Sequence, residues 1–146
     1  MYDTIMVAID GSPTAQHALD EAIRLAKAVG SKLVIAHVVD NTHVKWDLGA
    51  LNMRKITETL IEHGHKLVAE AMLKAQQAGV QAAKVTTDDP LTYIDVATEL
   101  ERLALQAGAQ AMVLGTHGRR GVRRALLGSV AESVVRLSSL PVLLVR

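Results

Sequence analysis

A glycine-rich segment between residues 115 and 129 holds the residue types most suited to chemistry. Three glycines and a serine in it follow the pattern G-x2-G-x9-G-S, at Gly115, Gly118, Gly128 and Ser129. Glycines let backbone N–H groups approach phosphate oxygens without a clash from a β-carbon. Ser129 is expected to cap a following helix, whose first N–H groups would face the anion. The spacing therefore predicts a loop that binds a polyphosphate.

The same segment carries charged and titratable side chains. Four arginines lie within six consecutive positions of the segment: Arg119, Arg120, Arg123 and Arg124. Arginine is well suited to phosphate, so a direct phosphate contact is one interpretation of the cluster, and a solvated face or a partner contact is the other. His117 has the chemistry of a general base, but a histidine in such a loop more often orders the loop, so we expect no catalytic role.

Motifs of the common nucleotide enzymes are absent from the sequence. There is no P-loop pattern G-x4-G-K-[ST], and no G-x-G-x-x-G follows the first apolar run. No kinase motif set, G-x-S-x-G elbow or H-E-x-x-H pair is present. Because no general base or water-orienting residue can be named, we expect a binding protein with slow nucleotide hydrolysis at most.

Regular elements alternate along the whole chain. Apolar runs predict buried strands at residues 2–9, 32–39, 80–87, 111–114 and 142–145. Amphipathic spacing predicts helices at residues 13–29, 52–78, 91–107 and 129–137. Ser12 is the expected cap of the first helix, residues 40–51 are expected to form a loop, and His37 is expected to be a buried residue with satisfied hydrogen bonds.

The alternation of strands and helices predicts an α/β fold in a single domain, residues 1–146. Right-handed crossovers would build a doubly wound, Rossmann-like parallel sheet of five strands in the order 3-2-1-4-5, with helices on both faces. Ligands of such sheets bind beyond the carboxyl ends of the strands, where the strand order reverses. Asp10, at the end of the first strand, would therefore face the glycine-rich segment, although a capping role for its side chain is the alternative.

Composition narrows the class of protein further. The chain has no cysteine, which excludes disulfides, thiolate metal sites and cysteine nucleophiles and is consistent with a reducing compartment. No apolar run reaches the roughly 18 residues needed to span a membrane, and the first residues lack the features of a signal peptide. A net charge of +1 argues against general nucleic-acid binding. We therefore expect a cytoplasmic protein that contacts neither membrane nor nucleic acid.

Several stretches resemble the ATP-binding branch of the universal stress protein family. Residues 114–118 read Leu-Gly-Thr-His-Gly, and residues 127–132 read Leu-Gly-Ser-Val-Ala-Glu. Both are similar to the sequence segments that flank the family's glycine motif. The closing run at residues 141–145, the Asp-Gly-Ser at residues 10–12 and the His-Val-Val at residues 37–39 also resemble family segments. Residues 40–51 match nothing in it.

The resemblance implies a role for particular residues. Gly115, Gly118, Gly128, Ser129 and Val130 would line the phosphates and ribose of ATP, and Thr116, His117 and Arg119 belong to the same loop. Asp10 would reach the ribose hydroxyls or a phosphate-bound Mg²⁺. Ala8, Ile9 and Val38 would touch the adenine. The resemblance also implies a homodimer that pairs the strand Val142–Val145 across a two-fold axis.

We therefore expect an ATP-binding stress-response protein, whose nucleotide-bound state a protein partner recognises. Three alternatives stay open: a slow ATPase or phosphotransfer enzyme on the same fold, a dimeric interaction module without nucleotide, and a binder of AMP or cyclic AMP.

Overall fold

The fold is built from five strands and four helices that alternate along the part of the chain that is described. The computed structural model describes residues 1–40, 49–87, 95–118 and 126–146. The elements are β1 (Thr4–Ala8), α1 (Pro13–Val29), β2 (Lys32–His37), α2 (Gly49–Gln77), β3 (Ala82–Thr86), α3 (Val96–Gln106), β4 (Ala111–Gly115), α4 (Ser129–Leu137) and β5 (Val142–Val145). None of the helices in these residues is both long and apolar enough to span a bilayer.

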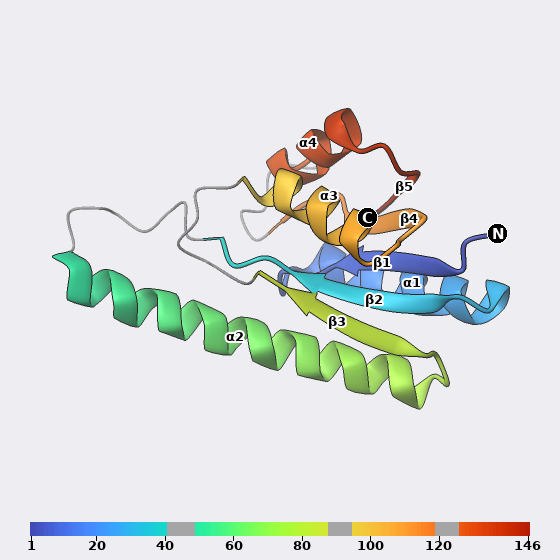
Figure 1. The fold of residues 1–146 in the computed structure, drawn as a ribbon, viewed down its shortest axis with the longest axis horizontal. Coiled ribbons are helices and arrows are strands. Elements are labelled where there is room, and N and C mark those ends of the chain that lie inside the picture. Colours follow the sequence, from blue (N-terminus) through green and yellow to red (C-terminus); the bar gives the residue numbers. More distant parts are fainter. Residues whose placement is uncertain (41–48, 88–94, 119–125) are drawn as a thin grey trace.

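The strands form one parallel sheet in the order β3-β2-β1-β4-β5, which confirms the predicted order (Figure 1). The central strand, β1, pairs with β2 on one side and with β4 on the other, so that Met6 lies opposite both Val34 and Met112. Its middle residues are fully buried. This burial from both faces explains why the strands read as continuous apolar runs.

Helices cover both faces of the sheet, as predicted (Figure 1). Successive side chains of a strand point to opposite faces. Ile5 and Val7 therefore pack in a core with α1 and α2. Met6 packs in a second core with α3 and α4. Alanines contribute many of the buried helix positions, including Ala18 and Ala22 in α1 and Ala97 and Ala104 in α3, and let the helices lie close to the sheet.

The start of α1 follows the prediction. The hydroxyl of Ser12 accepts a hydrogen bond from the N–H of Ala15 at 3.2 Å, and Pro13 is the first helical residue. Proline fits there because the first N–H groups of a helix have no partner within it. The start of α1 is therefore held beside the end of β1.

Two other helix starts differ from the prediction. The helix expected from residue 91 begins at Val96, because the carboxylate of Asp95 accepts the N–H groups of Ala97 and Thr98 and acts as an N-cap. Residues 88–94 of the expected helix and its preceding turn lie outside the described residues. The helix expected from residue 52 begins at Gly49, so part of the loop predicted at residues 40–51 is helical.

The expectation that Ser129 caps α4 is wrong. Gly128 occupies the N-cap position, with extended backbone angles, and Ser129 is the first helical residue. No side chain makes a capping hydrogen bond at this end. The first N–H groups of α4 therefore keep their hydrogen-bonding capacity for something other than a cap.

His37, at the end of β2, is buried as predicted. Its side chain is 7% exposed, and its Nδ1 lies 2.8 Å from the carbonyl oxygen of Ile9. Because a carbonyl can only accept, Nδ1 carries the proton of this hydrogen bond. The bond ties the end of β2 to the residue that follows β1.

Candidate functional site

A pocket of about 640 Å³ lies at the carboxyl ends of β1, β2 and β4. The chain leaves β1 towards β2 and β3 on one side, and β4 and β5 lie on the other side, so the strand order reverses between β1 and β4. Parallel sheets bind ligands at such a reversal. The pocket therefore lies where the fold predicts a ligand.

Most of the site residues predicted from the sequence line this pocket. They are Ala8, Ile9, Asp10, Val38, Gly115, His117, Gly118, Gly128, Ser129 and Val130. Thr116 does not line it, and Arg119 lies outside the described residues, together with the rest of the arginine cluster. The sheet thus brings together segments that are more than a hundred positions apart in the sequence.

Thr116 connects the two described ends of the glycine-rich segment. Its N–H donates to the carbonyl oxygen of Val145 at 2.8 Å, and its own carbonyl oxygen accepts the N–H of Gly128 at 2.7 Å. Its hydroxyl lies 2.9 Å from Nδ1 of His117. Thr116 is buried, so it joins β5, the glycine-rich loop and the start of α4 without facing the pocket itself.

The glycines of the motif have different neighbours. A β-carbon on Gly115 would lie 2.6 Å from Oγ1 of Thr14 and 2.8 Å from the backbone nitrogen of Ala15. Gly115 therefore permits β4 to end directly against the first turn of α1, although it also borders the pocket. A β-carbon on Gly118 would instead face the pocket side, 3.2 Å from Oδ2 of Asp10. Gly115 thus serves packing, and Gly118 leaves the space beside Asp10 open.

Asp10 and the start of α4 form the polar end of the pocket. Oδ1 of Asp10 accepts the N–H of Ser12 at 2.9 Å, which fixes the orientation of the carboxylate. In α4 the hydrogen bond from the N–H of Glu132 to the carbonyl of Gly128 is 2.9 Å long. The N–H groups of Ser129 and Val130 precede it and have no partner within the helix. Such N–H groups and the positive end of the helix dipole attract anions.

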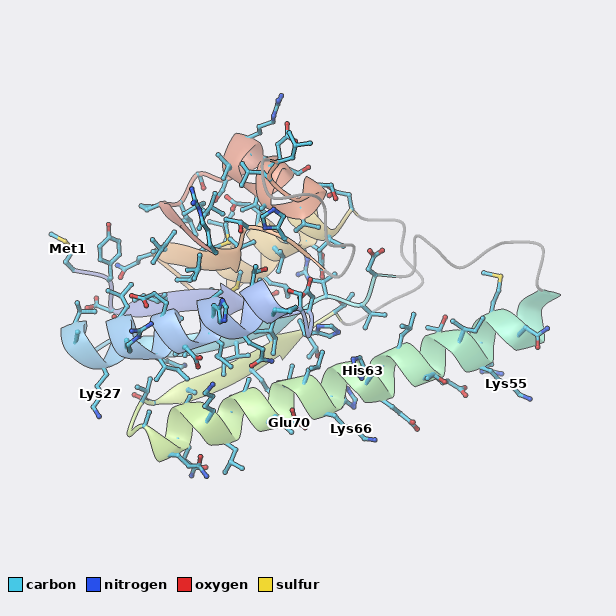
Figure 2. The ribbon with its side chains drawn as sticks, turned by 180° about the vertical axis from the view of Figure 1, so that it is seen from behind. Met1, Lys27, Lys55, His63, Lys66 and Glu70 are labelled. Carbon is cyan, nitrogen blue, oxygen red and sulfur yellow. The ribbon has the colours of Figure 1, made fainter. Side chains whose placement is uncertain are left out.

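Two helices supply walls that sequence analysis missed. Leu60 and His63 of α2 and Val96 and Leu100 of α3 line the pocket. Figure 1 shows α2 running beyond the carboxyl ends of the strands, and His63 is labelled on it in Figure 2. Gly64, in the middle of a long helix, was an available signal, because glycine is unfavourable inside a helix and often has a packing reason there. Leu60, Val96 and Leu100, together with Val38, give the pocket apolar wall surface.

Carboxylates are the charged groups among the described lining residues. Asp10, Asp40 and Asp95 line the pocket, and no lysine or arginine does so within the described part of the chain. The hydroxyl of Thr98, followed by the N–H groups of Ala97 and Thr98, outweighs partial burial and lowers the pKa of Asp95. Asp95 is thus an ionised cap. A polyphosphate here would need additional positive charge.

A metal ion held by protein alone does not fit the described residues, since no three histidine, aspartate or glutamate side chains gather closely enough among them. Asp10 on its own offers a single carboxylate. A divalent cation at Asp10 would therefore share its remaining ligands with phosphate oxygens and water, as Mg²⁺ commonly does.

Comparison with known proteins identifies the family of the chain. The sequence profile of the universal stress protein family matches residues 1–146. The chain belongs to the universal stress protein family. It is 33% identical to universal stress protein YxiE of Bacillus subtilis, an alignment that covers 100% of both chains.

Solved structures of the family have the same fold. A universal stress protein from Burkholderia pseudomallei is 34% identical, with a TM-score of 0.78 over 99% of this chain and 96% of that one. A universal stress protein solved in complex with cAMP is 27% identical, with a TM-score of 0.68 over 99% of this chain and 97% of that one. The universal stress protein fold is thus present over nearly the full length of the chain.

Proposed function

We propose that this universal stress protein binds ATP together with a divalent cation in the pocket between β1 and β4. The observation that carries the proposal is the convergence of Asp10, Gly118 and the uncapped start of α4 on one pocket at the reversal of the strand order.

The polar end of the pocket fits the phosphates. Gly118 offers a backbone without a β-carbon, and the first N–H groups of α4, from Ser129 and Val130, have no side-chain cap and can donate to an anion. Gly128 leaves the approach to these groups open because it has no side chain to cap them. A volume of about 640 Å³ lies within the range of roughly 300–1,000 Å³ that small-molecule sites occupy.

The apolar lining of the pocket fits the base. Ala8 and Ile9 at the end of β1, Val38 after β2 and Leu100 of α3 provide apolar surface for a flat ring. The relative solved with cAMP supports an adenine ring as the preferred base. That relative also makes a cyclic or linear adenosine monophosphate the second candidate ligand.

Asp10 is the residue that would hold the cation. With Asp40 and Asp95 near the pocket, a free triphosphate would meet negative charge, and a divalent ion between Asp10 and the phosphates relieves that repulsion. When bound, the ion supplies charge neutralisation and orients the phosphates. His117 lies against Thr116 through Nδ1 and holds the loop, so we propose binding with slow hydrolysis at most.

The biological role that we propose is regulatory. Nucleotide binding would change the surface around the glycine-rich loop. A protein partner in the cytoplasm would recognise this changed surface during stress. We also propose a homodimer through β5, because this edge strand leaves Leu143 42% exposed, and exposed apolar edges need cover.

A thermal-shift experiment tests the proposal. Protein from which bound nucleotide has been removed is melted with Mg²⁺ and ATP, ADP, AMP, cAMP or GTP. Ligand at 100 times its dissociation constant adds about 2.7 kcal/mol, which raises the melting temperature by several degrees for a chain of this size. We expect the largest rise with ATP. A larger rise with cAMP would favour the second candidate, and no rise with any nucleotide would reject both.

A further inference from the structure

The backbone of the glycine-rich loop is bonded to the first turn of α1. The hydroxyl of Thr14 donates to the carbonyl oxygen of His117 and lies 3.3 Å from the N–H of His117, from which it accepts. The hydroxyl of Ser12 donates to the same carbonyl oxygen at 3.3 Å. One threonine side chain therefore contacts both backbone polar groups of the residue that precedes Gly118.

This contact sets the orientation of the next peptide group. The carbonyl of His117 and the N–H of Gly118 belong to one planar trans peptide, so they point in opposite directions. Holding the carbonyl towards α1 turns the N–H of Gly118 away from α1. The nitrogen of Gly118 lies beside Gly128, whose β-carbon would come within 3.3 Å of it. The N–H of Gly118 is thus held near the start of α4.

We infer that Thr14 is a positioning residue for the phosphate end of the pocket. The inference rests on the proposed nucleotide binding and extends it to a residue outside the glycine motif. Thr14 fixes the peptide between His117 and Gly118 before the ligand arrives, and preorganised donors bind an anion without a cost for ordering the loop. Its side chain is absent from the pocket lining, so it acts through the loop and does not touch the ligand.

Ser12 makes a weaker test of the same idea. Its hydroxyl caps α1 by accepting from Ala15, and its N–H holds Asp10. A change at Ser12 would therefore disturb the helix and the carboxylate together. Thr14 is half-buried, and its side-chain hydrogen bonds join it to His117, so the effect of its hydroxyl on the loop can be isolated.

The variants are Thr14→Val, which removes the hydroxyl at nearly constant volume, and Thr14→Ser, which keeps it. Thr59→Val is the matched control, because the Thr59 hydroxyl bonds Lys55 within the exposed face of α2. ATP and adenosine are titrated into each nucleotide-free protein by calorimetry. We expect Thr14→Val to bind ATP about tenfold more weakly, which corresponds to about 1.4 kcal/mol. Adenosine affinity should change by less than about twofold, since the nucleoside has no phosphate.

The conservative variant separates positioning from general stability. Thr14→Ser and Thr59→Val should bind ATP like the wild type. Thr14→Ala, which removes the hydroxyl without adding a methyl group, is the second variant if Thr14→Val folds poorly, and it should show the same loss for ATP alone. Amide hydrogen exchange at His117 should also become faster in the absence of nucleotide, because its N–H loses the acceptor.

Equal affinity of wild type and both hydroxyl-deleted variants for ATP would overturn the inference. So would an equal loss for ATP and adenosine, which indicates general damage to the pocket. Failure of the wild type to bind ATP would reject the proposed function and this role together, whereas wild-type binding with unchanged binding by Thr14→Val rejects this role alone.

Discussion

The imidazole ring of His37 lies against the backbone of Gly64 in α2, so closely that a β-carbon on Gly64 would overlap its Cδ2 and Nε2 atoms. The same ring is bonded through Nδ1 to the carbonyl of Ile9. The ends of β1 and β2 and the middle of α2 are thereby packed together. This packing places Leu60 and His63 of α2 at the pocket.

Gly64→Ala should destabilise the protein, contrary to the usual effect of this change in a helix. Helix propensity alone favours alanine by about 1 kcal/mol, but the overlap with His37 forces a side chain or the helix to move, at a cost of about 1–3 kcal/mol. Urea-induced unfolding measures the difference. In a His37→Ala background the penalty should shrink, since the space is vacated. A variant as stable as the wild type would show that α2 does not press on His37.

Glu101 connects α3 to the turn between α4 and β5. Its carboxylate accepts the hydroxyl of Ser138 at 2.6 Å and the N–H and hydroxyl of Ser139 at 2.9 Å and 2.8 Å. Partial burial opposes ionisation, but the hydrogen bonds from Ser138 and Ser139 outweigh it and lower the pKa of Glu101. The turn is therefore held best when Glu101 is charged.

Glu101→Gln should destabilise the protein by about 1 kcal/mol at neutral pH. The value is small because the carboxylate of Glu101 is partly exposed to solvent. Because the folded-state pKa is lowered, this stabilisation is present above the ordinary glutamate pKa of about 4.3 and is lost as the pH falls through the folded value. Urea unfolding of both proteins should give curves that converge on acidification. A difference that stays constant down to about pH 3 would contradict the role of the charge.

Much of the fold could be predicted from the sequence, because the apolar runs and the helical spacing are strong local signals. Asp95 was missed as a cap because Ile94 continues the apolar spacing of α3 towards residue 91, so periodicity extended the helix past its start. Ser129 was taken as a cap on residue type, although the glycine before it holds that position.

Only part of the candidate site could be predicted from the sequence. Asp10 and Gly118 follow strands and could be placed by topology. Leu60 and His63 could not, because their distance from the strand ends depends on how α2 packs on His37. Thr14 was also hidden, since its contact with His117 joins positions more than a hundred residues apart.

Asp10→Asn should remove most of the effect of Mg²⁺ on ATP affinity. The amide oxygen of asparagine can still accept the N–H of Ser12, so the local fold should be kept, while the charge that would hold the cation is gone. Calorimetry with ATP in Mg²⁺ and in EDTA measures the effect for both proteins. An equal dependence on Mg²⁺ would assign the cation to other residues.

Leu143→Lys should convert the proposed dimer into a monomer. Leu143 is 42% exposed on the edge strand β5, so lysine should cost little stability in the single chain but place a charge in a β5–β5 contact. Size-exclusion chromatography with light scattering gives the mass. Leu105→Lys, on the exposed side of α3, is the control and should stay dimeric. A monomeric wild type would reject the dimer.

Calorimetric titration of ATP with Mg²⁺ into nucleotide-free wild type, Gly118→Val and Ala28→Val tests the central claim most directly. Valine at Gly118 fills the space beside Oδ2 of Asp10, whereas Ala28 is exposed in the last turn of α1. We predict one ATP per chain for the wild type and Ala28→Val, and affinity at least about tenfold weaker for a folded Gly118→Val. Absence of ATP binding by the wild type, or equal binding by all three proteins, would contradict a nucleotide site at this loop.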